Sequence, residues 1–209
     1  MRYFLLLATV LGVTGITACS HCPKGTALVG LAPPEGMEQS CQGPDGTKHG
    51  QWTRWHGNGE RALERSFQAG VPHGPVRLWY DNGQPSEAGN YDQGKPVGTW
   101  TFWYRNGVKW FEFNYNEAGR LDGLSRAWHV NGEKRYEWNY KDGEAQGAWV
   151  WWYENGQKRA EGLKQAGTED DGVTSQWMRD GTKRDQPEQI GDAPIRAPRP
   201  WAHQEGISP

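Results

Sequence analysis

The sequence has no excess of basic charge and is poor in the aliphatic residues on which most protein cores depend. Its 23 Lys and Arg residues are set against 25 Asp and Glu, for a formal net charge of −2. A basic surface for nucleic acid is therefore not expected. Only 35% of the residues are hydrophobic, a fraction that in an ordinary chain favours disorder.

The local motifs of common enzyme classes are also missing. The chain contains no Gly-x-Ser-x-Gly, no phosphate-binding loop and no zinc-protease helix. We predict a protein without catalytic residues, metal ligands or cofactors, which acts by binding rather than by catalysis.

Aromatic residues and glycine are abundant instead. The chain has 13 Trp, 8 Tyr and 29 Gly. Large aromatic side chains supply the buried surface that aliphatic residues would otherwise provide. Glycine and aromatics at regular spacing are typical of short strands joined by tight turns, so the composition predicts an all-β fold.

The N-terminus has the form of a targeting segment. A basic start at Arg2 precedes an uncharged apolar run from Tyr3 to Gly15, which is too short to span a membrane as a helix. The sequence Ile16-Thr17-Ala18-Cys19 then resembles a bacterial lipobox, with Ile16 in place of the usual Leu. The resemblance implies that Cys19 is lipidated after removal of residues 1–18. The alternative is an ordinary secretory signal beside a coincidental cysteine.

The predicted export suggests a location and a use for the remaining cysteines. Ser20 follows Cys19 where the inner-membrane sorting pattern has Asp, which favours the outer membrane of a Gram-negative cell envelope. Export places Cys22 and Cys41 in an oxidising compartment, and we predict a disulfide between them. The alternative is a pair of free thiols.

Repeats of about 24 residues fill the middle of the chain. They begin at Gly50, Gly74, Gly98, Gly123, Gly147 and Gly172. Each carries Trp five positions later, at Trp55, Trp79, Trp103, Trp128, Trp152 and Trp177. A turn dipeptide follows, at Asn58-Gly59, Asn82-Gly83, Asn106-Gly107, Asn131-Gly132, Asn155-Gly156 and Asp180-Gly181.

Asn-Gly between aromatic segments is a strong signal for a β-hairpin with a two-residue type I′ turn, in which both central residues have positive φ. We therefore expect an elongated, curled single sheet, an antiparallel meander of five to six hairpins. The register of such a turn makes Phe102 face Phe111 and Trp100 face Phe113. The same register pairs Trp151 with Ala160, Trp149 with Gly162, Gly98 with Tyr115, Gly123 with Tyr140, Thr101 with Glu112, and Arg126 with Glu137.

The register also separates two faces. One carries a continuous aromatic cluster, expected to be partly covered by sheet curvature or by the chain ends. The other carries charged residues and the repeated Trp. Equivalent residues two strands apart are about 9.6 Å apart, so these Trp form a ladder and are our candidate accessible surface: Trp55, Trp79, Trp103, Trp128, Trp152 and Trp177. The alternative is that the ladder is structural packing.

Two other recurring positions are read as structural. His56 and His129 share a position that Tyr80, Tyr104 and Tyr153 hold elsewhere, which indicates a packing role. A row of glutamates (Glu64, Glu112, Glu137 and Glu161) is expected to contain solvated cross-strand partners rather than the paired carboxylates of a glycosidase.

The pattern Gly-x-Trp-x-x-Trp-Tyr-x-Asn-Gly resembles the MORN repeat. It appears as Gly98-Thr-Trp-Thr-Phe-Trp-Tyr-Arg-Asn-Gly107 and as Gly147-Ala-Trp-Val-Trp-Trp-Tyr-Glu-Asn-Gly156. More narrowly, the chain resembles the bacterial YwqK-type variant, labelled a putative antitoxin, some members of which are exported lipoproteins. The resemblance implies a β-hairpin array with interaction roles and no catalytic site.

The chain is accordingly divided into a signal peptide (1–18), a tether and cap (19–49), the repeat array (50–181) and a Pro-rich tail (182–209) expected to be disordered. The expected function is an envelope lipoprotein, attached to the membrane by its lipid, that presents a scaffold to a protein partner. A glycan or peptidoglycan binder using the Trp ladder, and an antitoxin-like inhibitor, are the alternatives.

Overall fold

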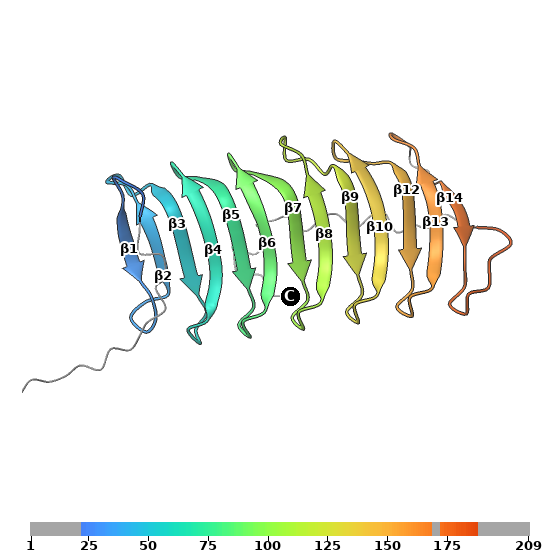
Figure 1. Cartoon of the computed structure of the whole chain (residues 1–209), viewed down its shortest axis with the longest axis horizontal. Helices are drawn as coiled ribbons and strands as arrows, with labels where there is room; N and C mark the ends of the chain where they lie inside the picture. The colour runs from blue at the N-terminus through green and yellow to red at the C-terminus, as the bar shows by residue number, and fades with distance from the viewer. Residues whose placement is uncertain (1–21, 169–171, 188–209) are drawn as a thin grey trace, which may run out of the picture.

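The computed structural model describes residues 22–168 and 172–187. These residues form one elongated antiparallel sheet, in which the strands lie side by side in chain order (Figure 1). The strands are β1 Ala27–Leu31, β2 Glu38–Gln42, β3 Lys48–Trp55, β4 Arg61–Gln68, β5 Val71–Trp79, β6 Pro85–Asp92, β7 Lys95–Trp103, β8 Lys109–Tyr115, β9 Gly123–Trp128, β10 Lys134–Lys141, β11 Glu144–Ala145, β12 Gly147–Trp152, β13 Lys158–Lys164 and β14 Val173–Gln176. The predicted all-β meander is confirmed. Nothing in the described part of the chain is a helix that could cross a membrane.

The Asn-Gly dipeptides do form hairpin turns, but the predicted type I′ geometry is wrong. In the β7–β8 hairpin, Gly107 N donates to Tyr104 O (2.9 Å) and Tyr104 N donates to Val108 O (2.8 Å). Only Gly107 has positive φ, at 84°, so the loop has three residues and ends in a glycine bulge. The asparagine stabilises the turn through its side chain, because Asn106 Oδ1 accepts a hydrogen bond from Val108 N (3.1 Å).

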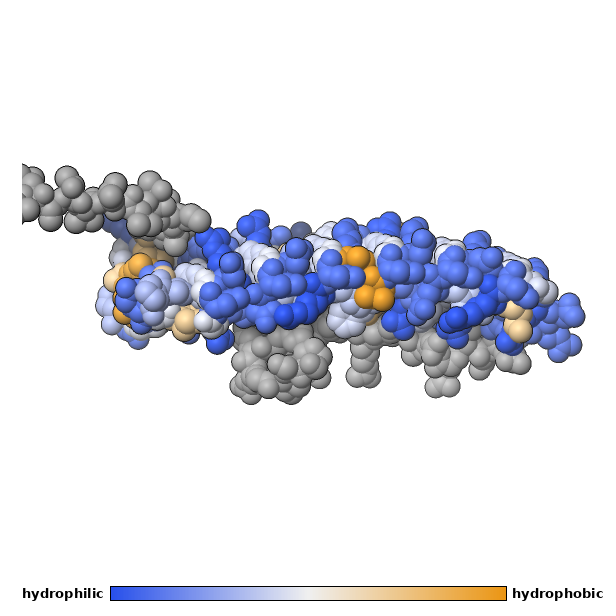
Figure 2. Space-filling view, turned by 90° about the horizontal axis from the view of Figure 1, so that it is seen from below, coloured by the Kyte–Doolittle hydropathy of each residue, from blue (hydrophilic) through white to orange (hydrophobic). Residues whose placement is uncertain are grey.

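Type I′ turns occur at the opposite edge of the sheet. Three two-residue turns there have positive φ at both positions: Ala69-Gly70, Gln93-Gly94 and Asp142-Gly143. The Asn-Gly turns lie along the lower edge in Figure 1, and that edge is hydrophilic over most of its length (Figure 2).

The predicted register is confirmed along the strands despite the different turn. Phe102 pairs with Phe111 and Trp100 with Phe113, and Trp151 pairs with Ala160. The register shifts only near the turn, where Trp103 pairs with Lys109. The bulge absorbs the extra residue there, so the faces of the strands are preserved. The other predicted pairs are also present: Trp149–Gly162, Gly98–Tyr115, Gly123–Tyr140, Thr101–Glu112 and Arg126–Glu137.

One side of the sheet carries the core. We call it the aromatic face and define it by eight side chains that are at most 3% exposed: Trp100, Phe102, Phe111, Phe113, Tyr136, Trp138, Trp149 and Trp151. Neighbouring rings contact one another along the sheet; for example, the Trp138 and Trp149 indoles stack with centroids 5.1 Å apart. Buried aromatic area therefore replaces the aliphatic core that the composition lacks.

Hydrogen bonds join each hairpin to the next one. The hydroxyl of Tyr104 donates to the carbonyl of Trp128 (3.0 Å), and Asn106 Nδ2 donates to the carbonyl of Val130 (3.1 Å). His56 holds the position equivalent to Tyr104, and its Nε2 lies 2.9 Å from Trp79 O. The interchange of His and Tyr therefore reflects a shared structural contact between repeats.

The ends of the array are closed differently. At the start, β1 and β2 form a further hairpin, and the predicted disulfide is present between Cys22 and Cys41. Cys19 lies outside the described residues. At the other end, Lys183 pairs with Trp177, so the last hairpin continues two residues past the boundary expected at 181. The rest of the predicted tail, from 188, also lies outside the described residues.

Candidate interaction surface

The six Trp of the ladder lie on the face opposite the aromatic face. Each is only partly buried, whereas the aromatic-face residues on the same strands are almost fully enclosed. In β7, for example, Trp103 is partly exposed and its neighbour Phe102 is 3% exposed. This contrast follows from the alternation of side chains along a strand.

From Trp103 onward, a lysine lies between each indole of the ladder and the next. Lys109 Nζ lies 5.4 Å from the ring centroid of Trp128, and Lys134 Nζ lies 5.4 Å from that of Trp152. Such cation–π contacts stabilise by about 0.5–1 kcal/mol each at exposed sites. The resulting row of alternating indoles and ammonium groups is called the Trp–Lys stripe: Trp103, Lys109, Trp128, Lys134, Trp152, Lys158, Trp177 and Lys183.

A charged row runs beside the stripe. Arg126 contacts Glu112 (3.0 Å) and Glu137 (3.4 Å) on the two neighbouring strands. Lys109 of the stripe contacts Glu112 (2.7 Å). Although burial opposes it, these cations hold the pKa of Glu112 below its usual value. The glutamate row is thus made of ion-pair partners, as expected, and these partners fix the lysines over the indoles.

Two charged residues on the buried side were not foreseen from the sequence. Arg65 is 5% exposed and Glu87 is 2% exposed. Neither carboxylate oxygen of Glu87 has a hydrogen-bond partner among the described residues. Burial raises the pKa of Glu87 to about 8, and the nearby Arg65 charge only partly opposes the shift. Burial therefore favours the neutral form of the Glu87 carboxyl.

Aligning the repeats would have revealed Glu87. The same position holds Leu63, Phe111, Tyr136 and Ala160 in the other hairpins, and all four are buried. A carboxylate at a position that is otherwise apolar is costly to bury. The cross-strand pairing of Glu87 with Phe102 places it at the edge of the aromatic face.

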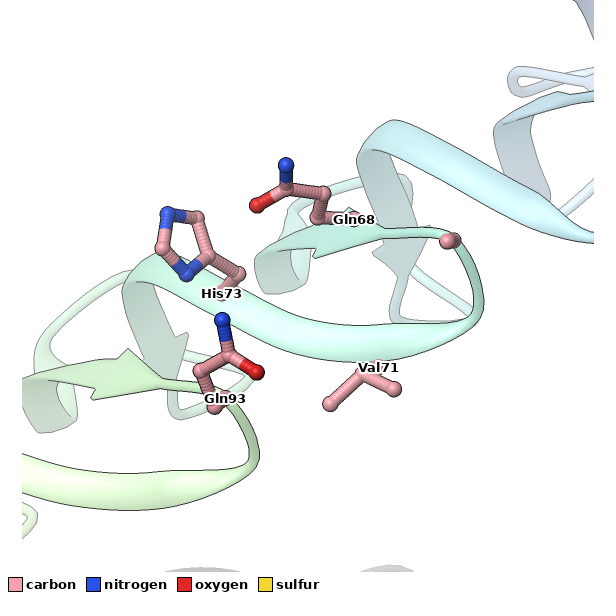
Figure 3. A pocket seen from close by; sticks show the side chains of 5 residues that line it. Gln68, Val71, His73 and Gln93 are labelled. Atoms are coloured by element: carbon pink, nitrogen blue, oxygen red, sulfur yellow. The ribbon is translucent and has the colours of Figure 1, made fainter.

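A small pocket lies at the type I′ edge of the sheet. It is lined by Gln68, Ala69, Val71, His73 and Gln93. Figure 3 shows the Gln68 and His73 side chains projecting to one side of the ribbon and Val71 to the other. His73 Nδ1 is 3.1 Å from Asp92 Oδ1. The pocket belongs to the turns and is separate from both the stripe and the aromatic face.

The described residues contain no group of three or more His, Cys, Asp or Glu side chains arranged to hold a metal ion. The stripe offers stacking surface, ammonium donors and carboxylate acceptors. This chemistry suits the binding of a peptide, a protein surface or a sugar.

Comparison with known proteins supports the repeat assignment. Residues 72–93, 96–117 and 145–163 match the MORN repeat variant. No curated protein matches the chain. Among solved structures, one described as "Crystal Structure of TarM" is 12% identical, with a TM-score of 0.26. That match covers 57% of this chain and 22% of the other chain. These three segments of the array are therefore similar to MORN repeats.

Proposed function

We propose that this protein is an envelope lipoprotein, anchored through Cys19, whose repeat array is a non-catalytic scaffold for a protein partner. The Trp–Lys stripe carries the proposal. It continues across four hairpins, its indoles are partly accessible, and three of its lysines are held in place by glutamates. Aromatic residues and cations set in such a row are typical of protein interfaces.

Photo-crosslinking in intact cells tests this role. A photoreactive amino acid at Trp128 is expected to give one defined adduct with a second protein after illumination. The matched control places the same amino acid at Glu117, which is exposed in a turn away from the stripe. Adducts that are equally frequent from both positions, or absent from every stripe position, would contradict the proposal.

A glycan partner is the second candidate, because partly exposed indoles can stack against sugar rings. Adding soluble cell-wall fragments should then quench Trp fluorescence in the wild-type protein, and Trp128→Ala together with Trp152→Ala should reduce this quenching. An antitoxin-like role rests only on the resemblance to the YwqK-type variant. A toxin gene adjacent to the coding sequence would favour that role.

A further inference from the structure

The aromatic face is more deeply enclosed than a single layer of strands allows. Trp100 and Phe113 are 0% exposed, and Trp138 and Trp149 are 1% exposed. The described strands nevertheless form one sheet with no second layer packed on it (Figure 1). Side chains on one sheet shield each other laterally, but their outer ends stay open to solvent unless another element covers them.

Three polar groups on this face indicate the kind of segment that binds over it. The Tyr136 hydroxyl, the Trp138 indole N–H and the Ser125 hydroxyl are buried and have no hydrogen-bond partner among the described residues. Buried donors of this kind need acceptors. Aromatic rings combined with hydroxyl and indole donors are how proteins bind extended proline-rich segments.

We propose that the aromatic face binds the chain's own C-terminal segment, residues 188–209, as an extended proline-rich strap. The segment contains Pro194, Pro198 and Pro200. Proline has no backbone N–H that would be left unsatisfied against an apolar face, while its carbonyl can accept from Tyr136 or Trp138. Trp201 supplies one more aromatic ring to pack on the face.

The segment is long enough and starts in the right place. The described chain ends at Pro187, just beyond β14 at one end of the sheet. From β14 the sheet extends nine strand spacings to β4, a stretch that includes every strand of the aromatic face and is about 43 Å long at the usual spacing. The segment has 22 residues and spans about 68 Å in the polyproline conformation. It can therefore cross every strand that contributes to the aromatic face.

Cleavage after folding tests the proposal. A protease site is inserted between Pro187 and Glu188 of the full-length protein, which is folded, cleaved and passed over a sizing column. The released peptide is expected to co-elute with the array. A dye-labelled synthetic peptide of residues 188–209 should then bind the array after its own segment has been washed out. Replacing Pro194, Pro198 and Pro200 in this peptide with alanine should weaken binding.

Variants on the two faces give matched controls. Tyr136→Phe and Trp138→Phe each remove one donor and should weaken peptide binding about fivefold, the effect of a typical net hydrogen bond. Trp152→Ala, on the opposite face, should leave peptide affinity unchanged. Loss of the peptide from a still-folded array, with no rebinding, would overturn the proposal. So would equal effects of the variants on both faces.

A second measurement uses the intact chain and does not require the cleaved array to stay folded. A photoreactive amino acid at Trp201 should crosslink to peptides that carry the aromatic face, such as the one containing Phe111 and Phe113. Crosslinks to Trp128 or to another molecule would show that the segment lies elsewhere. A concentration-dependent dimer in sedimentation would show instead that a second copy covers the face.

Discussion

At the scale of single residues, the two residues of each Asn-Gly turn have different roles: the asparagine forms side-chain hydrogen bonds, and the glycine adopts positive φ. Asn106 accepts from Val108 N and donates to the next hairpin, and Gly107 alone takes the left-handed conformation. The sequence indicated a turn at this point, but the dipeptide is common to type I′ turns and to loops ending in a glycine bulge. Only the hydrogen bonds distinguish the two.

Gly107→Ala should destabilise the protein by about 1–2 kcal/mol, because φ at this position is 84° and a side chain there is strained. Gly57→Ala is the matched control. Gly57 lies in the equivalent loop between β3 and β4, its φ is not positive, and an added Cβ there would meet no atom within 4 Å. Urea unfolding of both variants measures the difference. Equal stabilities would show that the positive φ of Gly107 is not required.

Glu87 should make the protein less stable as pH rises. Burial raises its pKa from 4.5 to about 8, so between these values the folded protein holds a proton that the unfolded chain has released. The free energy of unfolding then falls with increasing pH, by up to about 1.4 kcal/mol per pH unit, and levels off above pH 8. Glu87→Gln should abolish this decline. Unfolding in urea at pH 5, 6.5 and 8.5 measures it.

The control for this prediction is Glu112→Gln. The pKa of Glu112 is lowered by Lys109 and Arg126, so its contribution is present near neutral pH and is lost as pH falls. Glu87→Gln should therefore be more stable than wild type at pH 8.5. Glu112→Gln should be less stable than wild type at neutral pH. Parallel pH curves for wild type and Glu87→Gln would contradict the assigned pKa.

At the scale of strands and hairpins, large side chains on one strand pack over glycines on the neighbouring strand. Gly89 lies beneath the Trp100 indole, and a Cβ built on it would be 2.2 Å from Trp100 Cδ2. Gly162 is placed in the same way beneath Trp149, at 2.5 Å from Cζ2. Each large ring thus lies over a glycine of an adjacent strand, so these glycines are required by packing rather than by φ.

Gly89→Ala should destabilise the protein by about 1–3 kcal/mol, because the added methyl group overlaps a fully buried ring. Trp100→Leu makes room for the added methyl group. The loss of unfolding free energy caused by Trp100→Leu should therefore be smaller in the Gly89→Ala background than in the wild-type protein. A double-mutant cycle from thermal or urea unfolding measures this coupling. Strictly additive effects would show that the two residues do not compete for space.

Hydrogen bonds between hairpins should contribute separately from packing. Tyr104→Phe removes the hydroxyl that donates to Trp128 O and should cost about 0.5–1.5 kcal/mol. Tyr115→Phe is the control, because no hydrogen bond of its hydroxyl is present in the described part of the chain and the loss should be smaller. Chemical unfolding compares them. A larger loss for Tyr115→Phe would contradict the structural role given to Tyr104.

Much of the strand pairing could be predicted from the sequence. The pairings of Phe102 with Phe111 and of Trp100 with Phe113 followed from the repeat and the turn spacing, because side chains alternate along a strand. The lysines over the ladder could not be foreseen, since Lys109 contacts Trp128 of the next hairpin. That contact depends on sheet twist and on the bulge, which a two-residue turn would not have placed there. Glu87 occupies the repeat position just before the glutamate row, a position at which the repeats were not compared.

At the scale of the whole molecule, the array has two unlike ends. The first hairpin, β1–β2, is joined by the Cys22–Cys41 disulfide to the segment that follows Cys19, and β14 ends the sheet at the far side (Figure 1). Only Ser20 and His21 separate Cys19 from Cys22, a span of at most about 10 Å. A lipid on Cys19 would therefore hold the β1 end of the array close to the membrane surface.

Cys19→Ala should release the protein from membranes into the soluble fraction, or block its processing, because lipid attachment needs the thiol and acyl chains supply the binding energy at about 0.8 kcal/mol per buried methylene. Cys22→Ala is the matched control three positions away. It removes the disulfide but should leave the protein in the membrane fraction with a lipid-modified N-terminus. Cell fractionation and intact mass of the mature chain measure both effects. Membrane retention and mature mass that are unchanged in Cys19→Ala, apart from the substitution itself, would show that the anchor lies elsewhere.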